Sequence, residues 1–195
     1  MDINVSNLSK SFGSIPVLTD FTATFPEHEL TCIMGPSGCG KTTLLNILMG
    51  FISPDSGTVE GVPRLKSAVF QEDRLCESFN AVSNVRLVCS RRLETAKIVS
   101  HLERIGLKGS LDKPVSELSG GMRRRVAIVR SILARSDILF LDEPLKGLDA
   151  DTKRVVIEYL KDNIQDRTVI MVTHDIDEVH ALEGRLLKMS RFRNI

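Results

Sequence analysis

Residues 35–42 read GPSGCGKT, directly after the apolar run LTCIM at 30–34. Glycines at positions 35, 38 and 40 allow the backbone to turn with its N–H groups facing inward, which creates a concave site for anions. A helix that begins at Lys41 would add free N–H donors and the positive end of its dipole. The pattern therefore predicts a loop that wraps a phosphate chain, held between a strand and a helix of an α/β fold.

Two side chains at the end of this loop carry expected roles. Lys41 supplies a mobile positive charge for the β- and γ-phosphates of a nucleotide, and the Thr42 hydroxyl is a ligand for Mg²⁺. A chance glycine turn is the alternative, but a predicted strand before the loop and a predicted helix after it argue against chance. The loop alone does not separate a kinase from a GTPase or a motor ATPase.

A second motif, ILFLDEP, occupies residues 138–144. Its four apolar residues are typical of a buried parallel strand, which would deliver Asp142 and Glu143 at its carboxyl end, where ligands bind in open α/β sheets. Asp142 is expected to hold Mg²⁺ through water, and Glu143 to orient and polarise an attacking water. The alternative is a solvated pair of carboxylates that ends a strand.

The order of hydrophobic patterns along the chain predicts the fold class. Alternation of apolar and polar residues indicates antiparallel strands, and short apolar runs indicate further strands, at 3–5, 21–25, 30–34, 59–62, 65–70, 138–141 and 169–172. Helical periodicity covers 41–49, 94–105, 121–134, 151–163 and 176–182. These patterns predict an α/β fold with a mixed or parallel sheet and an N-terminal antiparallel β-subdomain. We expect residues 1–195 to form a single domain that contains a small helical subdomain at about 72–134.

Composition narrows the class of function. The 195 residues carry a formal net charge of +1 with 26% charged residues, which argues against a broad nucleic-acid-binding surface. The four cysteines match neither a zinc pattern nor a disulfide framework, so reduced thiols are expected. The start MDINVSNLSK lacks the features of a signal peptide, and no apolar run approaches the ~20 residues that span a bilayer. Any membrane role is therefore expected to come through a partner.

A serine and two glycines precede a predicted helix in LSGGMRRR at 118–125 and form a second anion-binding helix start. In order, the chain carries GPSGCGKT, Gln71 after a strand, LSGGM, ILFLDEP, GLD at 147–149 and His174 after VIMVT. In content and order this set resembles the ATP-binding cassette (ABC) ATPases over nearly the whole chain. The resemblance implies a P-loop NTPase core, ATP and Mg²⁺ as cofactors, and ATP hydrolysis as the activity.

The resemblance also assigns roles position by position. The catalytic residues it implies are Glu143, His174 and Gln71, with His174 contacting the γ-phosphate. The metal ligands it implies are Thr42, Gln71 and Asp142. The nucleotide-binding residues it implies are Phe12, Gly35, Pro36, Ser37, Gly38, Cys39, Gly40, Lys41, Thr42, Thr43, Ser119, Gly120, Gly121 and Asp149.

By the same resemblance, two copies pack head to tail around two ATP molecules. The segment Ser119–Gly121 would bind the γ-phosphate of ATP held by the other subunit, and Asp149 would cross the interface. This arrangement explains two anion sites in one chain. Asp149 is also suited to cap the helix that follows it. Phe12 would offer its aromatic face to adenine, and the alternative for Phe12 is a core position near a strand end.

The resemblance implies the ATPase subunit of a membrane transporter, and of an importer, because one compact cassette stands without a membrane span. The run FQEDRL at 70–75 and Met122 in LSGGM are similar to importers for nitrate, sulfonate and taurine, whereas Lys146 before GLD departs from the common pattern. The alternative is a soluble ABC ATPase that acts in assembly or nucleic-acid processes. The run Arg123–Arg125 is interpreted as a solvated helix face, and the alternative is contact with phosphate or with neighbouring carboxylates.

The implied partners are a second ABC subunit, expected to be an identical chain, and transmembrane permease subunits. The permease is expected to dock between the α/β core and the helical segment 72–118, close to Gln71. A substrate-binding protein is a further partner of importers, and no nucleic acid is expected. The implied location is the cytoplasmic face of the cell membrane, as a peripheral subunit.

Overall fold

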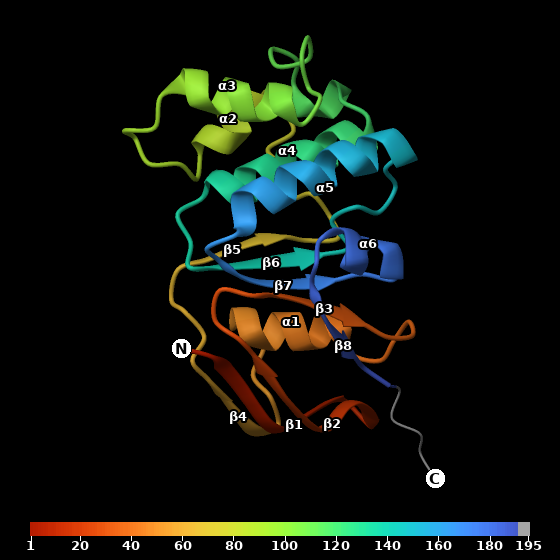
Figure 1. The fold of residues 1–195 in the computed structure, drawn as a ribbon. Coiled ribbons are helices and arrows are strands. Elements are labelled where there is room, and N and C mark those ends of the chain that lie inside the picture. The colour runs from red at the N-terminus through yellow and green to blue at the C-terminus, as the bar shows by residue number, and fades with distance from the viewer. Residues whose placement is uncertain (191–195) are drawn as a thin grey trace.

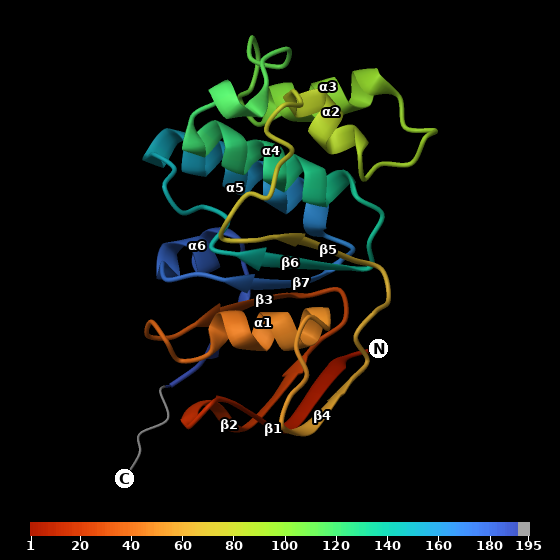
Figure 2. The same cartoon turned by 180° about the vertical axis from the view of Figure 1, so that it is seen from behind.

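The computed structural model describes residues 1–190 and shows two β-sheets with helices between and above them. Figure 1 shows the layers in order: an antiparallel sheet, helix α1 (Lys41–Met49), a parallel sheet, and then two layers of helices. Figure 2 shows from behind that α1 lies between the two sheets. The predicted α/β class with an N-terminal antiparallel sheet is confirmed.

The antiparallel sheet has the strand order β2-β1-β4. Its strands are β1 (Ile3–Phe12), β2 (Ile15–Phe25) and β4 (Ser56–Glu60). Register shifts interrupt the β1–β2 pairing after Val5, and each shift breaks the alternation of apolar and polar residues. The first two strands are therefore much longer than the alternating segments that predicted them.

The parallel sheet has the strand order β5-β6-β7-β3-β8. Its strands are β3 (Leu30–Met34), β5 (Lys66–Val69), β6 (Ile138–Asp142), β7 (Thr168–Val172) and β8 (Arg185–Lys188). Every pairing in it is parallel. The carboxyl ends of β3 and β6 consequently lie at one edge, on either side of β7, which is where an open α/β sheet binds its ligand.

Both faces of this sheet are buried, as the continuous apolar runs predict. Ile138 and Phe140 of β6 belong to a core shared with α1 and the antiparallel sheet. Leu139 and Leu141 point the other way, into a core shared with the helices above. The sheet is thus held from two sides, which fixes the position of its carboxyl edge.

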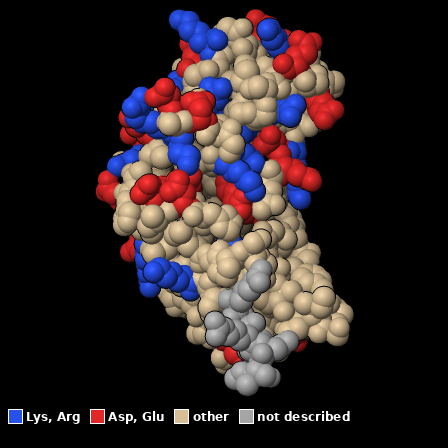
Figure 3. Space-filling view, turned by 90° about the vertical axis from the view of Figure 1, so that its right-hand side faces the viewer, with Lys and Arg blue, Asp and Glu red and all other residues tan. Residues whose placement is uncertain are grey.

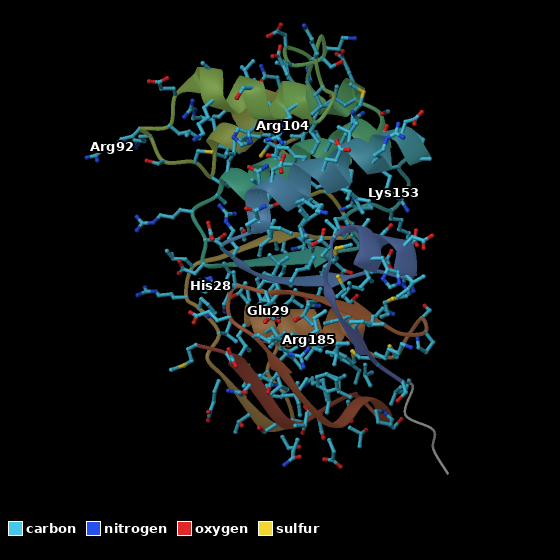
Figure 4. All side chains as sticks on the ribbon, viewed as in Figure 1. His28, Glu29, Arg92, Arg104, Lys153 and Arg185 are labelled. Carbon is cyan, nitrogen blue, oxygen red and sulfur yellow. The ribbon has the colours of Figure 1, made fainter. Side chains whose placement is uncertain are left out.

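The upper helices are α2 (Ala81–Arg86), α3 (Thr95–Arg104), α4 (Gly120–Leu133) and α5 (Ala150–Ile164), with a 3₁₀ turn at Val115–Glu117. Helix α6 (Ile176–Ala181) lies lower, beside the parallel sheet (Figure 1). Side chains join α3 to α5: His101 Nδ1 lies 2.9 Å from the Tyr159 hydroxyl, and Arg104 pairs with Asp162. Figure 4 shows Arg104 in this position above α5. None of the described helices is long and apolar enough to cross a bilayer.

Candidate active site

A cavity of about 350 Å³ opens at the carboxyl edge of the parallel sheet. It brings together residues from distant parts of the chain: Ser37, Gln71, Glu143, Lys146, Thr173, His174, Asp175 and Glu178. This edge lies at the right of Figure 1 and faces the viewer in Figure 3. In Figure 3, acidic and basic side chains intermingle over the helical layers and the parallel sheet. The antiparallel sheet below contributes few charges to this face.

The glycines of the phosphate loop are required by its close contacts. A Cβ on Gly35 would lie 2.4 Å from the main-chain oxygen of Met189, and a Cβ on Gly40 would lie 2.7 Å from Leu18 Cδ2. Gly40 also has a φ of 96°, which favours glycine, and it caps the start of α1. The loop therefore leads from β3 into α1 with the first N–H groups of the helix free of intrahelical partners.

Lys41 is buried, with 6% of its surface exposed, and its ammonium lies inside the loop. Nζ donates to the main-chain oxygens of Gly35 at 2.8 Å and Pro36 at 3.1 Å. The cation is thus held beneath the loop by the same residues that would surround a phosphate. An anion in the loop would offer this ammonium a charged partner in place of two neutral carbonyls.

Thr42 and Asp142 meet where α1 and β6 converge. Thr42 Oγ1 donates to Asp142 Oδ2 over 3.2 Å. The other oxygen, Asp142 Oδ1, is buried and has no hydrogen-bond partner among residues 1–190. Burial raises the pKa of the Asp142 carboxyl above its ordinary value, against the opposing hydrogen bond from Thr42. A hydroxyl beside a carboxylate oxygen without a partner fits the oxygen ligands that Mg²⁺ prefers.

Glu143 follows directly and has a strained backbone, with a φ of 49°. His174 Nε2 lies 2.9 Å from Oε1 of this carboxylate, and Lys146 Nζ lies 2.6 Å from Oε2. Burial raises the pKa of the Glu143 carboxyl, but the contacts with Lys146 and His174 outweigh burial, so the pKa lies below its ordinary value. The side chain is therefore an ionised carboxylate directed into the cavity.

Gln71 is exposed at the cavity, and a side chain of α4 holds its main chain in place. Arg124 Nη2 donates to the Gln71 main-chain oxygen at 2.6 Å, Nη1 donates to the Phe70 oxygen, and Asp73 lies 3.3 Å away as an ion partner. Arg124 is only 7% exposed. The interpretation of the arginine run as a solvated face is wrong at this position.

The segment Ser119–Gly121 and Asp149 lie at the starts of two helices. Ser119 caps α4 through a hydrogen bond from the Met122 N–H, and Asp149 caps α5 through the Thr152 N–H at 2.9 Å. A Cβ on Gly121 would lie 3.3 Å from Leu148 Cδ2, so the two helix starts adjoin. None of these residues lines the cavity that holds Glu143.

The sequence profile of the chain settles its family. The family model described as ABC transporter matches residues 18–146, from β2 through the end of β6 and beyond Glu143. The chain belongs to the ABC transporter family. The predicted membership, with the ATP binding and ATP hydrolysis that define these subunits, is confirmed.

Relatives of this ABC ATPase extend the match to nearly the whole chain. The bicarbonate transport ATP-binding protein CmpD of Synechocystis sp. is 38% identical over 208 residues, which cover 96% of this chain and 74% of that protein. The taurine import ATP-binding protein TauB of Jannaschia sp. is 35% identical, covering 95% of this chain and 76% of that protein. The dimeric structure of a bacterial ABC transporter cassette matches with a TM-score of 0.83 at 27% identity, covering 96% of this chain and 94% of that chain. The fold is thus the P-loop NTPase core of an ABC cassette.

Three further nucleotide-binding predictions fall on residues outside the cavity of this ABC ATPase. Phe12 is 51% exposed at the end of β1, which rules out the core position considered for it. Cys39 is 4% exposed and packs in the core beside α1, so only its main chain can face a ligand. Thr43 lies half-buried in the first turn of α1.

Sequence reasoning missed a network that supports His174. Lys153 of α5 pairs with Glu178 at 2.8 Å and Asp175 at 3.0 Å, and Glu178 accepts a hydrogen bond from the Thr173 hydroxyl. Figure 4 shows Lys153 at the end of α5 that faces α6. The pairing with two carboxylates raises the pKa of Lys153, most strongly through Glu178. The spacing of these residues carries no motif, so only the tertiary structure reveals the network.

Proposed function

We propose that this ABC ATPase hydrolyses Mg²⁺-bound ATP at the cavity between the phosphate loop and the end of β6. The convergence of Ser37, Glu143 and His174 on one cavity carries this proposal. Glu143 takes the role of general base, because an ionised carboxylate at the mouth of the phosphate loop can orient and polarise a water. His174, whose Nε2 lies 2.9 Å from Glu143, keeps that carboxylate oriented and contacts the γ-phosphate.

Thr42, Asp142 and Gln71 are the residues that would hold Mg²⁺. The fit rests on Asp142 Oδ1, a buried oxygen without a partner in the described chain, next to the Thr42 hydroxyl. When bound, the metal ion neutralises charge on the β- and γ-phosphates. Lys41 adds a second positive charge, and the loop residues from Gly35 to Thr43 supply main-chain donors. Phe12 offers an exposed ring for adenine at the end of β1.

We infer that the working form is a head-to-tail dimer of identical chains. The segment Ser119–Gly121 and Asp149 are functional positions in the family, yet they lie outside the cavity of their own chain. In a dimer, the free N–H groups at the start of α4 would complete the pocket of the opposite subunit. The dimeric form of the matching bacterial cassette supports this arrangement.

The dimer would drive transmembrane permease subunits, and its cellular place would be the cytoplasmic face of the membrane, through those subunits. Exposed apolar side chains support a docking surface on the helical subdomain at about 72–134: Phe79 is 43% exposed, Leu87 56% and Val88 43%. All three flank α2 and follow the Gln71 loop in sequence. The names of the relatives, with bicarbonate transport and taurine import among them, favour import of a small solute and a substrate-binding protein as a further partner.

Co-purification in detergent tests this function. The chain should form a stable complex with a polytopic permease, and ATP turnover by the complex should require Mg²⁺ and be lost in Glu143→Gln. A purely soluble partner would instead support the alternative of an ABC ATPase in assembly or nucleic-acid processes. Undiminished turnover by Glu143→Gln would remove the proposed general base.

A further inference from the structure

Each oxygen of the Glu143 carboxylate has a side-chain partner. Lys146 Nζ lies 2.6 Å from Oε2, and His174 Nε2 lies 2.9 Å from Oε1. Charge-assisted contacts of this length are roughly twice as strong as neutral hydrogen bonds. The carboxylate keeps further acceptor positions for a water, but two such donors draw charge from it, so Glu143 is a weaker base toward water while both contacts are in place.

Lys146 is placed over Glu143 by a turn that the chain itself fixes. The Lys146 N–H donates to the main-chain oxygen of Glu143 at 3.2 Å. Leu145 is 1% exposed and anchors the turn in the core. Gly147 follows with a φ of 76° and open space around it. The backbone is thus held, whereas the Lys146 side chain is 67% exposed and free to leave Glu143.

The cavity offers Lys146 a second partner once nucleotide enters. Lys146 and Ser37 of the phosphate loop line the same cavity. A terminal phosphate in that loop would carry more negative charge than one carboxylate and would compete for the ammonium. The turn also lies directly before Asp149, where a second subunit is proposed to approach. Dimer formation would therefore also change the surroundings of Lys146.

We propose that Lys146 is a positioning residue whose ion pair with Glu143 weakens this carboxylate as a base toward water. Glu143 and the terminal phosphate compete for the Lys146 ammonium, so in the purified subunit the pair lowers ATP turnover without abolishing it. This inference rests on the proposed role of Glu143 as general base. It requires no new bond, only the exchange of one ion partner for another.

The test measures basal ATP turnover by the purified subunit, without permease, for Lys146→Met and Lys146→Arg. Lys146→Met should raise kcat about three- to fivefold, the size expected for the loss of an ion pair with one exposed partner, and should leave the KM for ATP within about twofold. Lys146→Arg keeps a cation over Glu143 and should retain the low rate. Lys161→Met is the matched control, because Lys161 forms a 2.6 Å surface pair with Glu183 away from the cavity, and its rate should equal that of the wild type.

A Lys146→Met subunit that turns over ATP no faster than the wild type would overturn the inference. So would an acceleration shared by Lys146→Arg or by Lys161→Met. Glu143→Gln, made alone and with Lys146→Met, separates the two levels of the proposal. If both Gln variants lose turnover but Lys146→Met alone is not accelerated, only the role of Lys146 is refuted. If turnover survives in Glu143→Gln, the role of Glu143 as general base is refuted, and the inference about Lys146 with it.

Discussion

Arg124 of α4 donates from Nη2 to the main-chain oxygen of Gln71 over 2.6 Å, across 53 positions of sequence. A second arginine of the same helix, Arg130, donates to the main-chain oxygens of Asp73 at 2.9 Å and Arg74 at 2.8 Å. The segment after β5 is therefore fastened to α4, the helix that begins at Ser119. Gln71 of one proposed nucleotide site and Ser119 of the other are thereby linked through one helix.

Replacing Arg124 should loosen this segment. Arg124→Ala leaves two main-chain oxygens and Asp73 without their partner, and we expect a loss of about 2–3 kcal/mol in the free energy of unfolding. Arg124→Lys keeps the charge but not the planar fork, so it should restore only part of the loss. Urea unfolding and amide exchange over residues 70–75 measure both effects. Arg123→Ala is the control, since Arg123 makes a long hydrogen bond of 3.4 Å to the Leu118 oxygen and none to the segment after β5 within residues 1–190. Equal losses for the two alanine variants would contradict the assignment.

Replacing Lys41 should weaken ATP binding. Lys41→Ala removes a cation that the loop holds with its own main-chain oxygens, and we expect the Kd for ATP to rise at least about tenfold, or about 1.4 kcal/mol. Titration calorimetry gives the Kd directly. Lys113→Ala, at an exposed position, should bind as the wild type does. An unchanged Kd in Lys41→Ala would remove this loop from the phosphate site.

Replacing Asp142 should change the Mg²⁺ concentration that turnover requires more than it changes the affinity for ATP. Asp142→Asn keeps the shape of the side chain but removes the charge, so the Mg²⁺ concentration for half-maximal turnover should rise about tenfold or more. Binding of ATP in EDTA should not weaken, because no metal ion is then held. The exposed Asp112→Asn serves as control for the loss of one negative charge. A Mg²⁺ dependence equal to that of the wild type would exclude Asp142 as a ligand.

Lys153 should contribute stability that depends on pH. Lys153→Met leaves the buried Glu178 carboxylate without its cation, and we expect a loss of about 1–3 kcal/mol near neutral pH. The hydrogen bond from Lys153 lowers the pKa of Asp175 below its ordinary value of 3.8, so this part of the stabilisation is present above that value. It is lost as the pH falls through the lower pKa of the folded chain. Urea unfolding of the wild type and of Lys153→Met should therefore show a difference in the free energy of unfolding that is constant above about pH 5 and becomes smaller below about pH 4.

Arg154→Met is the matched control for Lys153→Met. Arg154 pairs with Asp151 on the surface of α5, with both side chains largely exposed, and its loss should change stability little. A gap between wild type and Lys153→Met that stays constant from pH 7 to pH 3 would show that the ion pairs are not its source.

The elements that the sequence predicted best are those whose ends are set by local chemistry. Helix α1 runs from Lys41 to Met49 as expected, because Gly40 and Gly50 both adopt left-handed backbone conformations that bound it. Strand β6 extends the predicted run by one residue to Asp142. The short strand β8 was not predicted, because its four residues, RLLK, carry too brief a pattern to distinguish it from a loop.

The parts of the site that were not predicted depend on contacts across the fold. In a run of three arginines on a helix, each residue points about 100° from the next, and nothing in the run itself reveals that Arg124 turns inward. The approach of Lys146 to Glu143 likewise follows from the turn after β6 and not from a motif. By contrast, the family resemblance assigned Glu143, His174 and Gln71 to one nucleotide site, and these three residues line one cavity at the carboxyl edge of the parallel sheet.

The pocket shared between two subunits is the central claim, and the association of a hydrolysis-blocked variant with nucleotide tests it most directly. Sedimentation equilibrium of Glu143→Gln should show a dimer when Mg²⁺ and ATP are present and a monomer when nucleotide is absent. Adding Ser119→Arg to the same variant should abolish the dimer and leave ATP binding intact. A Glu143→Gln protein that binds ATP yet remains monomeric at every concentration would contradict the shared pocket.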